Sequence, residues 1–384
     1  MNDAALEGFR VLDLSHGLAG PSATKLLADF GAEIIKVEPP QKGDFTRSLT
    51  PWVFDSFNRS KKSIAVDLKS TEGRDIVRDL ARISDVVVQS FRPGVVEEMG
   101  LGRDDLASLN PRLIYVSFSG FGQTGPDSAR RGIDPVLQAE TGLALIQGGL
   151  LGSLSFVDSA SGLALVGAVL ASLLKRERTG IVEHVEVNLL DVAMYLQTAP
   201  ILECSVTGKM LDQTGHASRY PLTGIFRAAD GPLYMGLYWD ADWVAFCELA
   251  GLPELSGDSR FATAADRSAN VAELRERVNK ILSARPRRDW IDGLEARGIL
   301  AGEVRTHTEL LAAEQVQVND TVEHLPTSKG AIGAYVRSPA HVPGRARPTA
   351  RPAPSVGQHT DAILDLIGIS AEKKHDLHQR NVVG

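Results

Sequence analysis

The stretch "FRVLDLSHGLAGPSATKLLADFGAEIIKVE" (residues 9–38) decides the fold. Its apolar start, "FRVLDL", is typical of a buried strand, "SHGLAGP" of a turn, and "SATKLLADFG" of a helix that ends at Gly31. "EIIKVE" (33–38) then predicts a second strand. A strand, a helix and a strand in so short a stretch predict a βαβ unit, whose two strands run parallel.

The same pattern recurs further along the chain. "KKSIAVDLK" and "SDVVVQSF" predict strands, and "STEGRDIVRDLARI" between them predicts a helix capped by Ser70 or Thr71. "RDDLASLN" predicts a short helix before the strand "RLIYVSFSGFG". These alternating elements indicate an open α/β sheet over residues 1–120.

The second half of the chain has a different texture. Leu163 to Arg178 predicts a helix stopped by Gly180, and a strand and a helix follow it. "GIFRAADGPLYMGLY" predicts a hairpin with Asp230 and Gly231 at its turn, before three helical stretches. The fold class predicted is α/β, with a large Rossmann-like open-sheet domain and a smaller α+β domain. The large domain covers 1–200 plus 345–384, the small domain 220–330, and linkers 201–219 and 331–344.

Composition limits the class of protein. The chain has 384 residues, of which 43% are hydrophobic, and a net charge of −7, which argues against a nucleic-acid partner. Cys204 and Cys247 form no CxxC, and no cluster has metal-ligand spacing, so no metal is expected. No signal-peptide pattern begins the chain, and the apolar run Leu163–Leu174 is too short to span a bilayer. We therefore expect a cytoplasmic protein without a membrane partner.

Two groups of residues near predicted strand ends suggest binding of a phosphorylated ligand. Gly17 and Gly20 allow close backbone approach in the turn after the first strand, which suits either a phosphate site or a βα turn without a ligand. His16 beside them is interpreted as structural. Basic residues also follow predicted strands, where open α/β sheets bind ligands, although scattered solvated surface charge is the commoner explanation of such residues; they are Lys69, Arg92, Arg130 and Arg131.

Asp158, in "SLSFVDSASGLALVGAVLASLLKRERTG" (153–180), has two interpretations. An Asp just ahead of an apolar helix is commonly its N-cap. As a nucleophile, an Asp with an ordinary pKa of about 3.9 is ionised at pH 7 and needs no activating base. A helix N-terminus favours that anion, and the small residues 159–162 leave room for a bulky electrophile. The residues alone leave both roles open.

Four long stretches together resemble the class III coenzyme A transferases, a family that includes formyl-CoA:oxalate and carnitine CoA-transferases. They are "VLDLSHGLAGPSATKLLADFGAEIIKVEPP", "FNRSKKSIAVDLKSTEGRDIVRDLARISDVVVQSFRPGVVEEMGLG", "LNPRLIYVSFSGFGQTGP" and "DSASGLALVGAVLASLLKRERTG". The resemblance implies that Asp158 is a covalent nucleophile, which forms an aspartyl anhydride and then an enzyme–CoA thioester. It also implies acyl-CoA and a small carboxylic acid as substrates, no permanently bound cofactor, and a homodimer of interlocked ring-shaped subunits.

The resemblance further assigns CoA contacts to eleven residues. They are Gly17, Leu18, Ala19, Val66, Asp67, Leu68, Lys69, Ser90, Phe91, Arg92 and Arg131, with phosphate contacts from Lys69, Arg92 and Arg131. Two positions depart from the family pattern, because Glu98 and Pro39 stand where relatives commonly carry Arg.

Two other functions remain as alternatives. A related acyl-CoA racemase or epimerase needs a His before the Asp of a "GHD" motif, whereas this chain has Gly132-Ile133-Asp134, and an isoleucine exchanges no proton. A non-catalytic acyl-CoA-binding protein is the third possibility, and the presence of Asp158 among small neighbours counts against it. Tyr238 and Trp239 suit either an acyl pocket or the core of the small domain.

Overall fold

The computed structural model describes residues 4–210, 220–344 and 347–384. The chain divides into two compact units. The first contains Met1–Leu143, Leu151–Thr198 and Asn319–Gly384, and the second contains Ala144–Leu150 and Ala199–Val318. The part of the linker predicted at 201–219 that falls in 211–219 lies outside the described residues.

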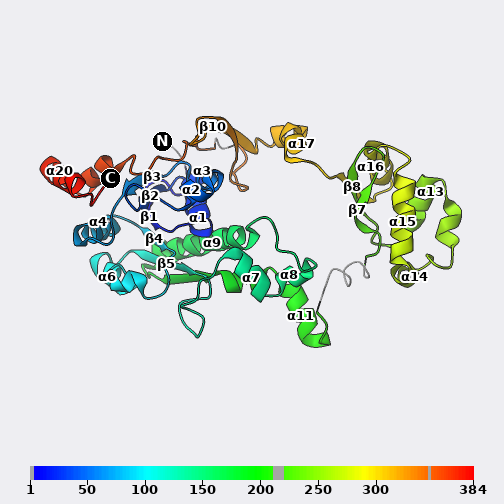
Figure 1. Ribbon diagram of the computed structural model, residues 1–384, viewed down its shortest axis with the longest axis horizontal. Coiled ribbons are helices and arrows are strands. Elements are labelled where there is room, and N and C mark those ends of the chain that lie inside the picture. Colours follow the sequence, from blue (N-terminus) through cyan, green and yellow to red (C-terminus); the bar gives the residue numbers. More distant parts are fainter. Residues whose placement is uncertain (1–3, 211–219, 345–346) are drawn as a thin grey trace. The chain divides into compact units, whose positions relative to one another are not determined.

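A six-stranded parallel sheet forms the centre of the first unit, in the order β3-β2-β1-β4-β5-β6 (Figure 1). The strands are β1 (Arg10–Leu14), β2 (Glu33–Glu38), β3 (Lys62–Ala65), β4 (Val86–Gln89), β5 (Ile114–Ser119) and β6 (His184–Asn188). Val11 lies beside Ile34 of β2 on one side and Val86 of β4 on the other. The strand order therefore reverses between β1 and β4, which is where open α/β sheets bind ligands.

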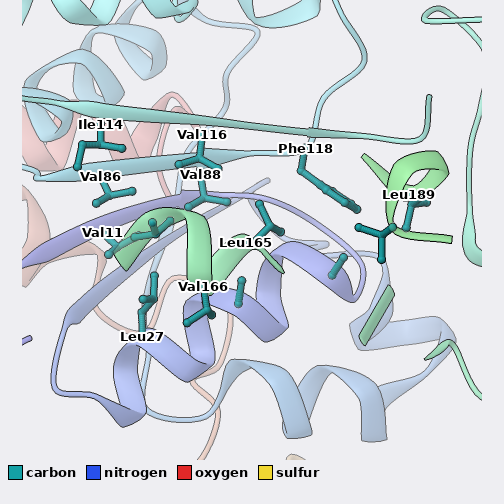
Figure 2. Packing of buried hydrophobic residues seen from close by; sticks show 14 of the residues in the cluster. Val11, Leu27, Val86, Val88, Ile114, Val116, Phe118, Leu165, Val166 and Leu189 are labelled. Atoms are coloured by element: carbon teal, nitrogen blue, oxygen red, sulfur yellow. The ribbon is translucent and has the colours of Figure 1, made fainter. Parts of the chain in front are cut away.

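Helices cover both faces of this sheet, because successive side chains of each strand point to opposite faces. Val11, Val88 and Val116 face one helical layer, where Leu27 and Leu165 meet them (Figure 2). That layer contains α1 (Ala19–Asp29), α7 (Asp134–Glu140), α9 (Phe156–Thr179) and α10 (Leu189–Tyr195). The opposite layer contains α4 (Thr71–Arg82), α6 (Arg103–Leu109), α19 (Thr360–Leu366) and α20 (Ala371–Gln379). The Rossmann-like prediction is confirmed.

Helix α9 starts earlier than its apolar run predicts. It begins at Phe156 rather than Leu163, so Asp158 lies in its first turn and not ahead of it. The extra turns contact α1: a Cβ on Gly162 would lie 2.0 Å from Ser22 Oγ, so only glycine fits there. Gly180, at a φ of 72°, ends the helix as predicted. By length and composition α9 would suit a membrane span, but its inner face is part of the core of this unit.

Shorter elements connect this framework. In the first unit they are α2 (Thr46–Leu49), α3 (Pro51–Asn58), α5 (Val95–Glu98) and the hairpin β10 (Val322–Pro326) and β11 (Ile332–Val336). The hairpin is tied to that unit by an ion pair of 2.8 Å between Glu323 and Arg59, and by a hydrogen bond from Ser328 to Asp55. These contacts explain why residues 319–344 group with the sheet, whereas the sequence pattern placed them in the small domain and a linker.

The second unit is α+β, as predicted. It contains an antiparallel sheet in the order β7-β8-β9, with Asp230 and Gly231 in the β7–β8 turn. Trp243, Phe246 and Trp290 form its aromatic core. Its strands are β7 (Thr223–Arg227), β8 (Pro232–Gly236) and β9 (Leu300–Glu303). Its helices are α11 (Thr198–Thr207), α13 (Asp240–Ala250), η1 (Pro253–Gly257), α14 (Ala264–Ala269), α15 (Val271–Leu282), α16 (Arg287–Glu295), α17 (His307–Ala312) and α18 (Glu314–Val318), and α8 (Leu143–Ile146) lies at the boundary of the units.

Candidate active site

Two of the predicted CoA segments meet at the carboxyl ends of β1 and β4. The backbone N–H of His16 donates to Ser90 Oγ at 3.0 Å, and the His16 ring lies edge-on to the Phe91 ring, 5.5 Å between centroids. Residues 17–19 and 90–92 are therefore joined through His16, at the point where the strand order reverses. His16 is a connecting residue, in agreement with its structural interpretation.

The turn after β1 depends on two glycines. Gly17 adopts a φ of 81° and donates its N–H to Asp44 Oδ2 at 3.3 Å. A Cβ on Gly20 would lie 2.3 Å from Ser15 Cβ, so the turn closes only with glycine at that position. Leu18 occupies the N-cap of α1 without capping it through its side chain. The amides at the start of α1 can therefore receive an anion.

Beneath this turn lie four buried ionisable residues, which we call the β1 charge cluster: Asp13, Lys36, Asp44 and Lys61. Lys61 Nζ lies 2.9 Å from Asp13 Oδ2, and Lys36 Nζ lies 3.1 Å from Asp44 Oδ2. Lys36 also donates to the backbone oxygen of Ser15 at 2.8 Å. The cluster is thus held by two ion pairs, and the hydrogen bond from Lys36 to Ser15 ties it to the turn.

Ion pairing outweighs burial for the two carboxylates of this cluster, whereas burial outweighs ion pairing for Lys61. Burial alone would raise the pKa of the Asp13 carboxyl, but the charges of Lys61 and Lys36 hold it well below its ordinary range. For Asp44, too, burial is outweighed, here by the neighbouring His16 ring, whose Nδ1 lies 3.8 Å from Oδ2, and by the charge of Lys36, and its pKa is depressed. Burial lowers the pKa of Lys61 to about 8 despite the attraction of Asp13.

The third predicted CoA segment, residues 66–69, lies at the end of β3, on the same side of the sheet. Val66 forms an isolated bridge with Val383, and Asp67 N–H donates to the Val382 oxygen at 2.8 Å. The Asp67 carboxylate accepts the N–H of Lys69 at 3.0 Å. Ser70 then caps α4 by accepting the Gly73 N–H, which confirms one of the two predicted caps.

The predicted phosphate-binding side chains are free. Lys69, Arg92 and Arg131 are exposed, and none forms an ion pair or a side-chain hydrogen bond within the described part of the chain. Arg130 differs from its neighbour, because it is paired with Glu140 and its guanidinium lies over the Phe121 ring. Of these two adjacent arginines, the resemblance assigned only Arg131 to phosphate, and Arg131 is the one without a partner among the described residues.

Asp158 does not act as a helix cap. Ser155 occupies the N-cap position of α9, and Asp158 is the third helical residue. Across residues 4–210, 220–344 and 347–384, no donor reaches the Asp158 carboxylate, whereas its backbone N–H donates to Asp134 Oδ2 at 2.9 Å. Asp134 is thus the acceptor at the start of α9, and the carboxylate of Asp158 is left available.

The Asp158 side chain lies on the face of α9 that meets the start of α1. Gly162, four residues further along, contacts the Ala19 backbone oxygen and Ser22 of that helix. Residues four apart share a helix face, so Asp158 lies one turn beyond this contact, toward the β1 turn. Ser161 is fully buried beside it, and its hydroxyl has no hydrogen-bond partner. This geometry brings the candidate nucleophile and residues 17–19 to the same edge of the sheet.

The ionisation of Asp158 differs from the sequence-based expectation of an ordinary pKa. Burial, and secondarily the like charge of Asp134, raise its pKa from 3.8 to about 7. The positive end of α9 favours the anion but does not outweigh burial and repulsion. Asp158 is therefore poised to change its charge near neutral pH, a range typical of reactive carboxyl groups.

Sequence reasoning missed the β1 charge cluster and the acceptor role of Asp134. Lys36 offered a signal, because it stands at an inward position of the apolar strand "EIIKVE". Asp134 offered none, because its partner is 24 residues away. Tyr238 and Trp239 are 37% and 68% exposed, so they are not core residues of the second unit. No group of three or more His, Cys, Asp or Glu side chains among the described residues could hold a metal ion.

Comparisons with known proteins agree with this arrangement. The model of CoA-transferase family III matches residues 6–360. A succinyl-CoA:glutarate CoA-transferase of Mus musculus is 38% identical, over 94% of this chain and 85% of its own length. A crystal structure of a probable fatty acyl-CoA transferase of Mycobacterium tuberculosis superposes with a TM-score of 0.83 at 36% identity, covering 95% of this chain and 100% of that one.

A second solved structure shows the same likeness. A CAIB/BAIF family protein of Brucella suis has a TM-score of 0.87 at 29% identity, over 95% of this chain and 99% of that chain. The resemblance inferred from the four sequence stretches is thereby confirmed over nearly the whole length. With the family model matched along residues 6–360, and with relatives of 36–38% identity aligned over nearly the whole chain, this chain belongs to CoA-transferase family III.

Proposed function

We propose that the Asp158 carboxylate is the covalent nucleophile of CoA transfer from an acyl-CoA to a free carboxylic acid. The observation that carries this proposal is the carboxylate itself, which lies at the start of α9 and accepts no hydrogen bond from the described residues. A carboxylate with a structural role would be expected to accept hydrogen bonds, as Asp13 does from Thr24 and Lys61.

Four exchanges at Asp158 account for the reaction. Its oxygen attacks the thioester carbonyl, the carbon–sulfur bond breaks, and CoA leaves as a thiolate beside an aspartyl acyl anhydride. The thiolate attacks Cγ of Asp158, which releases the donor acid and leaves an enzyme–CoA thioester. The acceptor carboxylate then attacks the same carbon, which breaks the carbon–sulfur bond, frees the thiolate again and gives a second anhydride. Finally the thiolate attacks the acceptor's acyl carbon in that anhydride, which forms the new acyl-CoA and releases the Asp158 carboxylate. Covalent catalysis divides one difficult exchange into easier steps and conserves the thioester energy.

The surroundings of Asp158 suit this chemistry in two ways. A raised pKa makes the ionised carboxylate a stronger base, and therefore a better nucleophile, than an ordinary aspartate. Partial burial limits access of water, which would hydrolyse the anhydride. The first step requires the ionised form, so we expect the rate of acylation to fall below about pH 7.

CoA is proposed to bind along the carboxyl ends of β1, β3 and β4. The backbone at Gly17, Leu18 and Ala19 and the segment Ser90–Phe91 would hold the ligand near the strand reversal. Residues 66–69 extend the site past β3. Lys69, Arg92 and Arg131 would contact its phosphates, since all three cations are exposed and have no partner among the described residues. No permanently bound cofactor is required.

Racemisation is not supported by the same site. Ile133, at the position of the racemase histidine, is 61% exposed and has no proton to exchange. A binding protein without activity would need no carboxylate free at the start of α9. Asp158 therefore favours transfer over both alternatives.

The test is intact mass spectrometry after addition of acyl-CoAs from a panel of donor acids. Wild-type protein should gain a CoA adduct that hydroxylamine or borohydride traps at Asp158, and Asp158→Ala should lose the adduct and at least about 10⁴-fold in exchange rate. Asp191→Ala is the matched control, because Asp191 also lies in the first turn of its helix and contacts Asn188. Full turnover of Asp158→Ala would refute the assignment, and CoA binding without any adduct would indicate a binding protein.

A homodimer in the cytoplasm completes the proposal. The outer surface of α9 and α10 in the first unit is apolar, with Leu163, Leu174, Met194 and Tyr195 between 45% and 80% exposed. A second copy of the chain would bury this surface. A monomeric mass in sedimentation equilibrium would contradict it.

A further inference from the structure

Asp134 is fixed at the end of β5 by close backbone packing. Gly120 follows that strand and Gly132 precedes α7, and a Cβ on Gly132 would lie 2.6 Å from the Gly120 Cα. Asp134 begins α7 two residues later and is 1% exposed. A carboxylate is thus placed inside the protein by a contact that only two glycines permit.

Both oxygens of Asp134 accept hydrogen bonds, as an ionised carboxylate does. Oδ2 accepts the backbone N–H of Asp158 at 2.9 Å, and Oδ1 accepts the side-chain amide of Gln138. Gln138 is fully buried, and its own oxygen accepts the N–H of Gly152 at 2.8 Å. The pair therefore connects α7 to the first turn of α9 and to the loop that leads into it.

Among the described residues, no cation is paired with the carboxylate of Asp134 or of Asp158. Burial and Asp134 are the two influences on the Asp158 carboxyl. Titratable groups of the elements that pack on α9 are engaged elsewhere: Lys25 with Asp29 on α1, Glu140 with Arg130 on α7, Asp191 with Asn188 on α10, and His184 with Ser117 and Glu186 on β5 and β6. At the start of α1 the contacts are Ala19 and Ser22, which do not titrate.

We propose that Asp134 is the positioning residue of the nucleophile: it fixes the first turn of α9 through the Asp158 amide and places a buried like charge beside the Asp158 carboxylate. This rests on the proposed function of Asp158. Two carboxylates in one site repel each other while both are ionised. When Asp158 becomes an anhydride or a thioester its charge is lost, and so is the repulsion. Asp134 thereby favours the covalent enzyme over the free enzyme without touching the substrate.

The experiment compares Asp134→Asn with the double variant Asp134→Asn/Gln138→Glu. The single variant removes the charge. The double variant restores the hydrogen-bond chain and moves the charge one side chain away. In the double variant, the amide at position 134 can accept a hydrogen bond from the Asp158 N–H and donate one to the carboxylate at position 138. That carboxylate can in turn accept the Gly152 N–H. The readout is the ¹³C-carboxyl titration of Asp158, assigned with Asp158→Asn, and the pH dependence of enzyme–CoA thioester formation is measured in parallel.

Wild-type Asp158 should titrate near pH 7, Asp134→Asn at least about one pH unit lower, and the double variant between the two. The acid limb of thioester formation should move with it, while the maximal rate of Asp134→Asn falls. A residue that only supports the fold would lower activity without moving either midpoint. Unchanged midpoints in folded variants would overturn the proposal, as would failure of both variants to fold.

The two readouts separate this inference from the proposed function. The carboxyl titration needs no substrate, so it reports the coupling even if no CoA adduct ever forms. A shifted titration without an adduct would remove Asp158 as the nucleophile and leave the coupling of the two carboxylates intact. A CoA adduct together with an unshifted titration would support Asp158 as the nucleophile and refute the coupling of the two carboxylates.

Discussion

The β1 charge cluster and the first turn of α9 place a buried and a partly buried carboxylate, Asp13 and Asp158, at the same edge of one sheet, with opposite results. Asp13 lies 2.9 Å from Lys61 Nζ, and its pKa is depressed. Within the part of the chain that the structure describes, the charge acting on the Asp158 carboxyl is that of a second carboxylate, Asp134, and burial together with that charge raises the Asp158 pKa to about 7. Burial raises the pKa of both carboxyls, so the sign of the nearest charge decides whether the net shift is downward, as for Asp13, or upward, as for Asp158.

The two regions also differ in what their hydrogen bonds fix. In the cluster, Asp13 and Lys36 are both bound to Ser15, so their charges hold the β1 turn in shape. At α9 the bonds end on the backbone of Asp158, and its side chain is left without a donor among the described residues. In the β1 charge cluster, charged side chains stabilise a turn. At the start of α9, a backbone hydrogen bond positions the residue that carries the carboxylate.

The largest effect should come from breaking the paired region. Asp13→Asn leaves Lys61 buried without its carboxylate partner, while Lys36 keeps Asp44, and the free energy of unfolding should fall by about 3–5 kcal/mol. Urea denaturation at pH 7 measures it. Asp75→Asn is the matched control, because it removes an exposed i,i+3 partner of Arg78 and should cost less than about 1 kcal/mol. Equal losses of unfolding free energy in the two variants would show that the buried ion pair contributes no more to stability than the exposed one.

Asp158→Asn should increase the free energy of unfolding, in contrast to Asp13→Asn, and the increase should depend on pH. The native pKa of Asp158 is raised above its ordinary value of 3.8, so the native state keeps a proton that the unfolded state has lost between about pH 4 and 7. Wild-type stability therefore declines across that window, and the asparagine variant avoids the loss. We expect it to match wild type at pH 4 and to exceed it by about 2 kcal/mol at pH 8, after a discount for partial exposure.

Urea denaturation at pH 4, 6 and 8 measures this difference. The deficit of Asp13→Asn should remain flat over the same range, because the depressed pKa of Asp13 places its titration at lower pH. A parallel pH course for the two variants would contradict the contrast between the regions.

The sequence predicted the framework better than the site. Alternating strand and helix patterns, with Gly31 and Gly180 as stops, follow from local chemistry, and the parallel sheet was recovered from them. The start of α9 was missed, because its first turns are small and polar residues that pack on α1 through Gly162. Asp158 was found as a candidate, but its pKa depends on Asp134, which a tertiary contact brings to it. A local sequence pattern cannot predict an interaction between charges that only tertiary contacts bring together.

The smallest effects should come from the cations that neither region uses. Lys69, Arg92 and Arg131 are exposed and unpaired among the described residues, so each can give its charge to a ligand phosphate. Replacing each one by Ala should weaken CoA binding by about five- to tenfold, close to the energy of one partly solvated charge-assisted hydrogen bond, and the loss should shrink in high salt. Isothermal titration calorimetry with CoA measures the affinity.

Arg178→Ala is the control for these variants, because Arg178 is an exposed arginine in the last turn of α9, at the opposite end of that helix from Asp158. It should leave CoA affinity unchanged, and all four substitutions should change the free energy of unfolding by less than about 0.5 kcal/mol. If Arg178→Ala weakens binding as much as the other three, the attraction comes from the net charge of the protein rather than from a phosphate site. In that case the three cations at this edge contribute to CoA binding no more specifically than other surface charges. The contrast between the two regions then applies only to their carboxylates, Asp13 and Asp158.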